Sequence, residues 1–171
     1  FTRETFIKRY NSDLANDYGN VINRITILIQ KNFNGLCPKP GKYDSTEIQL
    51  IDLCKSIILK ADKYMKELKI HDALEIIFSL IREINKYLEI KQPWKLVKEN
   101  KAPESPAATC LYISTELLRI CSILLNPFMP NKTQITLDCL SQPDNSQLEF
   151  GIIKPDMEIR HPGALFPRIE E

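Results

Sequence analysis

The chain has 171 residues, of which 43% are hydrophobic and 26% charged, and its formal net charge is +1. These values are typical of one soluble globular domain and exclude a disordered or fibrous chain. Because the net charge is close to zero, binding to nucleic acid would require a local basic patch. We find no run of about 18 apolar residues and therefore expect no membrane span.

The start of the chain and its cysteines indicate where the protein works. It begins at Phe1 instead of Met, so we expect a part cut from a longer protein, and its first residues lack the basic, apolar and small-residue order of a signal peptide. The five cysteines are odd in number and show no C-x-x-C spacing. This pattern favours reduced core thiols in a cytoplasmic protein, with zinc or redox chemistry as the lesser alternative.

Helical spacing of apolar residues begins at once. The first predicted helix covers residues 4–33, and Gly35 follows its last turn. Gly19 interrupts this helix, and we expect it to let a neighbouring element approach closely. Asp44 stands three residues before a glutamate, which is a variant of the capping box, and it begins a second predicted helix that ends near Leu68.

Two further helices follow with short connections. Asp72 can cap the third, and the Lys91-Gln92-Pro93 segment stops it because proline cannot continue a helix. Ser105-Pro106 is a start signal for the fourth, which ends at Asn126-Pro127. A short helix restarts at Pro130. This pattern predicts an all-α, antiparallel helix bundle.

The C-terminal part loses the helical pattern. From residue 141 onward proline and glycine are scattered, and only Phe150–Ile153 is strand-like. We therefore divide the chain into a helical bundle, residues 1–140, and an irregular tail, residues 141–171, that packs back on the bundle or toward another domain of a longer parent chain. The tail carries seven acidic and three basic residues from position 138, so contact with RNA is not expected there.

No catalytic or metal-binding motif is present in the sequence. His71 and His161 lie beside no nucleophile or ligand set, and the carboxylates are dispersed over polar helix faces. The nucleotide-binding, metalloprotease and hydrolase motifs are also missing. We therefore assign no catalytic residue and no metal ligand to this chain.

Two polar side chains in the first helix point to base recognition. Asn20 and Arg24 are spaced i, i+4, so they share a helix face about 6 Å apart along the axis. Their planar amide and guanidinium can read the hydrogen-bonding edge of an extruded base. The alternative is a pair that merely satisfies itself. Asn85, beside an apolar seam, is interpreted as structural, holding the Pro93-Trp94 turn or the neighbouring helix.

The single tryptophan lies in a basic stretch. Trp94 follows the helix break directly, where it could be a core residue or an exposed plate on which a base stacks. Residues 82–101 carry six basic against three acidic side chains, which favours the second interpretation. Lys91, Lys95 and Lys98 are the candidate phosphate contacts.

Three stretches together resemble a known family. RYNSDLANDYGNVINR (9–24), INKYLEIKQPWKL (84–96) and ALFPRIEE (164–171) are similar, in order and spacing, to the anticodon-binding domain of methionyl-tRNA synthetase. The resemblance covers nearly the whole chain. It implies a helix bundle of the class Ia synthetase type that recognises the CAU anticodon of methionine tRNA.

The resemblance also assigns residue roles. Asn20 and Arg24 match the family's pair that contacts the first anticodon base, a cytosine, and Trp94 matches the tryptophan that stacks against the anticodon. Leu165 to Ile169 match an ending that runs back toward the catalytic domain, so we expect them to pack. The implied partners are the tRNA anticodon loop and the catalytic domain of the same parent chain, with no role for DNA or membranes.

The class I catalytic signatures, His-Ile-Gly-His and Lys-Met-Ser-Lys-Ser, are missing from the chain. This part alone is therefore not expected to be an enzyme and needs no cofactor. ATP, and zinc as a second candidate, would belong to the catalytic domain of a cytoplasmic parent, which we expect to be monomeric. Two alternatives remain: the anticodon-binding domain of another class Ia synthetase, and a helical protein-interaction module without RNA.

Overall fold

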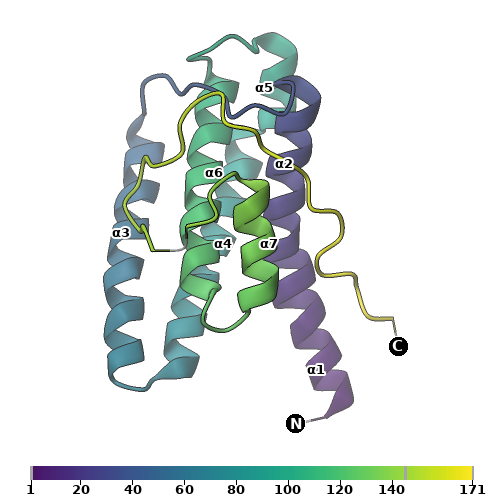
Figure 1. Ribbon diagram of the computed structural model, residues 1–171, viewed down its shortest axis with the longest axis vertical. Helices are drawn as coiled ribbons and strands as arrows, with labels where there is room; N and C mark the ends of the chain where they lie inside the picture. Colours follow the sequence, from purple (N-terminus) through teal and green to yellow (C-terminus); the bar gives the residue numbers. More distant parts are fainter. Residues whose placement is uncertain (1, 145, 171) are drawn as a thin grey trace.

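A computed structural model describes residues 2–144 and 146–170. Over these residues the elements are α1 (Arg3–Arg9), η1 (Tyr10–Gly19), α2 (Asn20–Asn32), α3 (Ser45–Lys66), α4 (Ile70–Lys91), α5 (Pro93–Glu99), α6 (Pro106–Leu125) and α7 (Pro130–Cys139). The long helices run up and down beside one another, as Figure 1 shows. The predicted all-α antiparallel bundle is confirmed.

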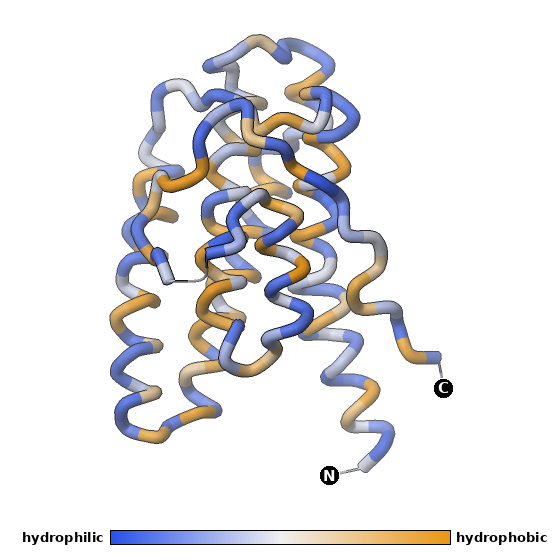
Figure 2. Tube along the Cα trace, viewed as in Figure 1, coloured by the Kyte–Doolittle hydropathy of each residue, from blue (hydrophilic) through white to orange (hydrophobic). Residues whose placement is uncertain are grey.

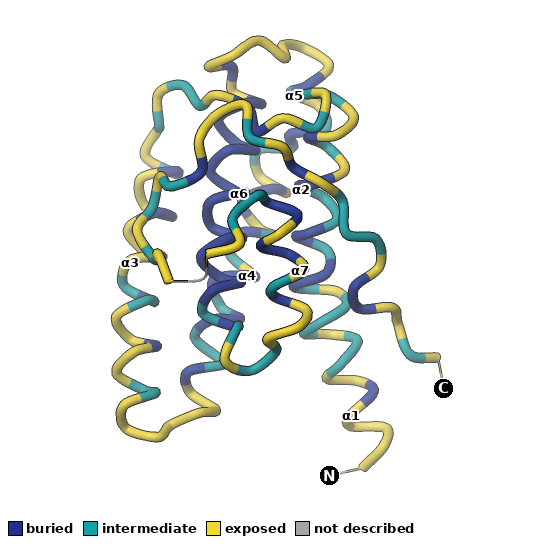
Figure 3. Tube along the Cα trace, in the orientation of Figure 1, coloured by how far each residue is buried: buried dark blue, intermediate teal, exposed yellow. Residues whose placement is uncertain are grey.

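Helix α6 forms the centre of the core. It contacts α2, α3, α4, α5 and α7, and nearly all its residues are buried (Figure 3). By length and composition α6 could cross a membrane, contrary to the expectation that no stretch is apolar enough. However, 94% of that stretch is buried inside the protein, as expected for a helix surrounded by others. The outer helices instead alternate apolar and polar positions (Figure 2).

The helix caps agree with the sequence at two of three places. Asp44 accepts hydrogen bonds from the backbone N–H groups of Thr46 and Glu47, and the Glu47 carboxylate accepts the Asp44 N–H at 2.6 Å. Ser105 caps α6 by accepting from the Ala108 N–H at 3.2 Å. Asp72 is not a cap, because α4 already begins at Ile70.

The end of α3 also differs from the prediction. The helix ends at Lys66, and Leu68 is 82% exposed with a left-handed φ of 59°. Leu68 therefore lies outside the apolar seam to which its spacing assigned it. Apolar residues can keep the i, i+4 spacing beyond the end of a helix, but their side chains then no longer point to the same face.

The first predicted helix is continuous but not uniform. Between α1 and α2 the ten residues of η1 form a π-helix. At the end of η1, a Cβ on Gly19 would lie 3.0 Å from the Leu14 carbonyl oxygen and 3.8 Å from the Phe166 ring. Phe166 of the tail packs beside Gly19 at an ordinary contact distance, so the tight contact is with the helix's own Leu14 carbonyl and the approach of Phe166 does not require a glycine.

The chain turns sharply between α4 and α5. Gln92 adopts the left-handed conformation, with φ 50° and ψ 58°, and Pro93 begins α5. The predicted stop is confirmed, whereas the short helix that follows it was not predicted. This helix contacts α2 and α6, so it presents Trp94 on the bundle near the end where α4 stops (Figure 1).

The tail follows the outside of the bundle, and its predicted strand is wrong. Instead of pairing with a strand, the N–H groups of Gly151, Ile152 and Ile153 donate to the buried Glu116 carboxylate of α6. Of the five residues Leu165 to Ile169 that the resemblance implied would pack, Leu165 and Phe166 are buried and Ile169 is half-buried, whereas Pro167 and Arg168 are exposed. Beyond them, Asn11 exchanges two hydrogen bonds with the backbone of Ile169, at 3.0 and 2.9 Å.

Candidate nucleic-acid interface

The three residues assigned to base recognition meet on one surface. Asn20 begins α2, Arg24 follows one turn later, and Trp94 is the second residue of α5. The Arg24 guanidinium carbon lies 5.3 Å from the centre of the Trp94 ring, a cation–π distance. All three side chains belong to half-buried residues. The indole is therefore neither sealed in the core nor on the opposite side of the bundle.

Arg24 is held from a second side by α4. One guanidinium nitrogen, Nη2, lies 2.5 Å from the Glu89 carboxylate, with 31% of the Arg24 and 56% of the Glu89 side chain exposed. The ring and the carboxylate together restrict the plane of the guanidinium. Sequence reasoning missed Glu89, because its role depends on a helix that is 65 residues away along the chain.

Asn20 pairs with α4 and not with Arg24. Its amide nitrogen donates to Asn85 Oδ1 at 3.2 Å, and the Asn85 amide nitrogen donates to the Asp17 carbonyl at 3.1 Å. Asn85 therefore holds the neighbouring helix, one of the two structural roles considered for it. One N–H of the Asn20 amide is used in this way, which leaves its second N–H as a donor and its carbonyl oxygen as an acceptor for a base.

Fewer of the basic residues around Trp94 are free of carboxylate partners than the sequence suggested. Arg82 Nε lies 3.0 Å from Asp17, and Lys86 Nζ lies 3.8 Å from Glu83. Lys95 and Lys98 are exposed on α5 and form no ion pair with a described residue. The uncompensated positive charge thus lies on the same short helix as the indole and, at the exposed Lys101, just after its end.

Lys91 differs from the other two candidate phosphate contacts. Its ammonium lies 2.5 Å from Asp44 and 2.7 Å from Glu47, and only 21% of its side chain is exposed. Partial burial opposes its charge, but the bonds to these carboxylates prevail and raise the pKa of Lys91. Bonds made with Glu47 and Lys91 hold the pKa of Asp44 well below its usual range.

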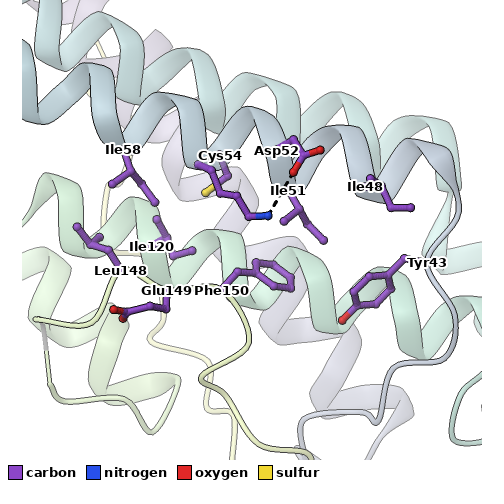
Figure 4. Close-up of a pocket in the computed structure, with 11 residues that line it drawn as sticks. Tyr43, Ile48, Ile51, Asp52, Cys54, Ile58, Ile120, Leu148, Glu149 and Phe150 are labelled. Carbon is purple, nitrogen blue, oxygen red and sulfur yellow. Dashed lines mark hydrogen bonds and ion pairs between the residues drawn. The ribbon is translucent and has the colours of Figure 1, made fainter.

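A pocket lies on the bundle away from the surface that carries Arg24 and Trp94. An open pocket of about 530 Å³ lies between α3, α6 and the tail, lined mainly by apolar side chains that include Ile51, Ile58, Ile120 and Phe150 (Figure 4). None of the predicted recognition residues lines this pocket. Its charged lining residues include Asp52 and Lys55, which pair with each other at 3.2 Å, and Glu149.

The cysteines are consistent with the core role predicted for them. All five are buried and free of disulfides, and burial raises the pKa of the Cys54 thiol to about 12. Among the described residues, no group of three or more His, Cys, Asp or Glu side chains could hold a metal ion.

Comparison with known proteins supports the resemblance. Residues 37–171 match the family described as the anticodon-binding domain of methionyl tRNA ligase. The methionine–tRNA ligase of Caldanaerobacter subterraneus subsp. tengcongensis is 35% identical over 174 residues, which cover 99% of this chain and 27% of that protein. The methionine–tRNA ligase of Mycobacterium tuberculosis is 30% identical, over 99% of this chain and 34% of that protein.

A solved structure agrees with these relatives. The apo crystal structure of Mycobacterium tuberculosis methionyl-tRNA synthetase superposes with a TM-score of 0.92 and 30% identity, over 100% of this chain and 35% of that one. The chain thus spans about a third or less of the proteins that it matches. It belongs to the family of methionyl-tRNA ligase anticodon-binding domains.

Proposed function

We propose that this domain reads the CAU anticodon of methionine tRNA within a longer methionyl-tRNA ligase. The parent would attach methionine to the tRNA, using ATP bound in its catalytic domain. The observation that carries the proposal is the Arg24 guanidinium resting on the Trp94 indole, with Asn20 one helical turn away. A polar pair beside an aromatic plate suits a base that has left its stack.

The free groups at this surface match the edge of cytosine. Along its hydrogen-bonding edge, cytosine offers an amino donor followed by two acceptors. At the first two of these three positions, uracil instead offers an acceptor and then a donor. The carbonyl oxygen of Asn20 can accept from the amino group, and the remaining Arg24 N–H groups can donate to the two acceptors. A matched set of contacts discriminates by about 1–3 kcal/mol, or roughly one to two orders of magnitude in affinity.

Trp94 contributes stacking. A base on an aromatic side chain gains about 1–3 kcal/mol, which offsets part of the cost of leaving the anticodon stack. In the free domain the guanidinium of Arg24 covers one face of the indole. A base that stacks on the indole and is read by Arg24 therefore requires the guanidinium to move from the ring face toward the base edge.

The first test of the proposal is the preference for cytosine. Anticodon stem-loops carrying CAU, UAU and GAU are titrated at one fixed salt concentration. Arg24→Gln should weaken CAU binding by about 10- to 100-fold and remove most of the preference over UAU. The matched control is Arg168→Gln, which removes an exposed arginine from the tail and should change neither quantity.

Two outcomes would contradict base reading. Equal losses on all three stem-loops for Arg24→Gln would make Arg24 a general electrostatic contact. No binding of any stem-loop at low salt would favour a protein-interaction bundle over an RNA-binding domain.

The second test concerns stacking. Trp94→Ala should lower affinity for the CAU stem-loop by roughly 5- to 100-fold, and Trp94→Phe should recover most of it, because every aromatic ring offers a face. The measurement is equilibrium binding by calorimetry. A Trp94→Ala variant that binds as tightly as the unaltered domain would show that no base stacks there.

A further inference from the structure

We propose that Lys91 is a positioning residue for Trp94, and that it does not contact phosphate. This inference rests on the proposed role of Trp94 as the plate for an anticodon base. It replaces the expectation, drawn from charge alone, that Lys91, Lys95 and Lys98 act alike.

The charge of Lys91 is already used within the domain. Two carboxylate oxygens, from Asp44 and Glu47, lie within 2.7 Å of its ammonium. The Glu47 side chain is only 6% exposed, and it also accepts the Tyr87 hydroxyl at 2.9 Å. A buried carboxylate is costly without a counter-ion, so Lys91 supplies what Glu47 requires. A phosphate would have to compete with both carboxylates for this ammonium.

The position of Lys91 in the chain makes this ion pair relevant to the indole. Lys91 is the last residue of α4, and only Gln92 separates it from Pro93, whose φ is fixed by its ring. The bonds to Asp44 and Glu47 tie this end of α4 to the first turn of α3. The direction in which α5 leaves, and with it the place of Trp94, depends on where that end is held.

The ion pair of Lys91 with α3 also affects Glu89, the second group that holds Arg24. Glu89 lies two residues before Lys91 on the last turns of α4, and its carboxylate and the indole hold the guanidinium from two sides. A recognition group works only if its supports keep it within about half an ångström of the productive position. Lys91 therefore acts on both supports of Arg24 without contacting Arg24 itself.

Fluorescence of the free domain tests the inference without RNA. Because Trp94 is the single tryptophan, its emission maximum and its quenching by iodide report on this position alone. Lys91→Met should shift the emission and change the quenching, and Lys91→Arg should restore both in large part. Lys95→Met, which removes the lysine next to the indole, is the control. It should not produce the emission shift expected of Lys91→Met.

A double variant separates positioning from simple charge neutralisation. Glu47→Gln combined with Lys91→Met removes the buried carboxylate charge, so the domain should fold even if Lys91→Met alone does not. The tie between α3 and α4 is still missing, and the emission should remain shifted. Normal emission and normal CAU affinity in the double variant would overturn the proposal.

Salt dependence separates positioning from phosphate contact. Lys91→Met should bind the CAU stem-loop about 5- to 10-fold more weakly with an unchanged slope of log affinity against log salt. Lys95→Met should reduce that slope by about 0.7, the value for one phosphate contact on a single strand. A reduced slope for Lys91→Met with normal emission would make Lys91 a phosphate contact and overturn the inference. If no stem-loop binds the unaltered domain, the proposed function fails, while the fluorescence experiment still decides whether Lys91 positions Trp94.

Discussion

Each polar side chain of the interface is held by a partner on α4. Arg24 is held by Glu89, and Asn20 is held by Asn85. In the proposed role, such contacts would keep the recognition groups oriented before RNA arrives, which lowers the ordering cost of binding. They would also compete with the base, because an Arg24 nitrogen bonded to Glu89 is not free to donate elsewhere.

Replacing Glu89 with glutamine should therefore strengthen binding. Glu89→Gln keeps a hydrogen-bond acceptor but removes a negative charge beside Arg24, and a half-exposed pair of this kind is worth at most about 1 kcal/mol. We expect CAU affinity to rise by roughly 2- to 5-fold in a stem-loop titration at low salt. Glu83→Gln is the matched control, since Glu83 lies on α4 but pairs with Lys86. An equal gain for both variants would show a general charge effect instead of competition for Arg24.

At the scale of elements, the start of α3 and the end of α4 stabilise each other. Asp44 and Glu47 lie in the first turn of one helix and Lys91 in the last turn of the other, which places each charge at the favourable end of a helix dipole. The capping box was readable from the sequence, because both of its residues are local. Its ion pair with Lys91, 47 residues away, was not.

This junction should make stability depend on acid. The native pKa of Asp44 is depressed, so on acidification the unfolded chain takes up this proton first, and stability is lost as the pH falls below about 4. Asp44→Asn keeps an effective cap but removes the titrating group. Its melting temperature should be lower at neutral pH, yet it should fall less between pH 5 and pH 2.

The control for this prediction is Asp52→Asn, which removes an exposed carboxylate from the same helix. Thermal melts of the three proteins across this pH range provide the comparison. If the melting temperatures of Asp44→Asn and of the unaltered domain fall in parallel with pH, Asp44 is not the source of the acid dependence.

At the scale of the whole molecule, a buried ion pair fastens the tail to the core. The Arg119 guanidinium bonds both oxygens of Glu116 at 3.1 and 3.0 Å, and it also donates to the carbonyls of Gln147 and Glu149. Both side chains are almost fully buried on α6. The backbone of the irregular tail thus forms hydrogen bonds with charged side chains of the central helix instead of with a neighbouring strand.

Removing one member of this pair should loosen the tail and lower stability. Arg119→Met leaves the Glu116 charge buried without a counter-ion, which costs about 3–5 kcal/mol in chemical denaturation. Limited proteolysis should then cut near residues 147–153 first. Combining Arg119→Met with Glu116→Gln should recover part of the stability, because no unpaired charge remains. Unchanged stability in Arg119→Met would show that the pair does not hold the tail.

Local patterns predicted much of the fold. Helix starts at Asp44 and Ser105 and the stop before Pro93 were correct, because caps and proline act through neighbours in the chain. The errors lie where local preference is overruled. Asp72 can cap a helix but lies inside one, and the Phe150–Ile153 stretch has strand-like residues but finds no strand to pair with among the residues that the structure describes.

The sequence by itself determined the helical bundle, the family resemblance and the identity of Asn20, Arg24 and Trp94 as the recognition candidates, because helical spacing and residue chemistry are local properties. Only the tertiary structure decided that Arg24 meets Trp94, that Glu89 and Asn85 hold Arg24 and Asn20, and that Lys91 is already neutralised by two carboxylates. The physical reason is that each of these contacts joins helices that are distant in sequence. Their distances depend on how the bundle packs around α6, which no local pattern specifies.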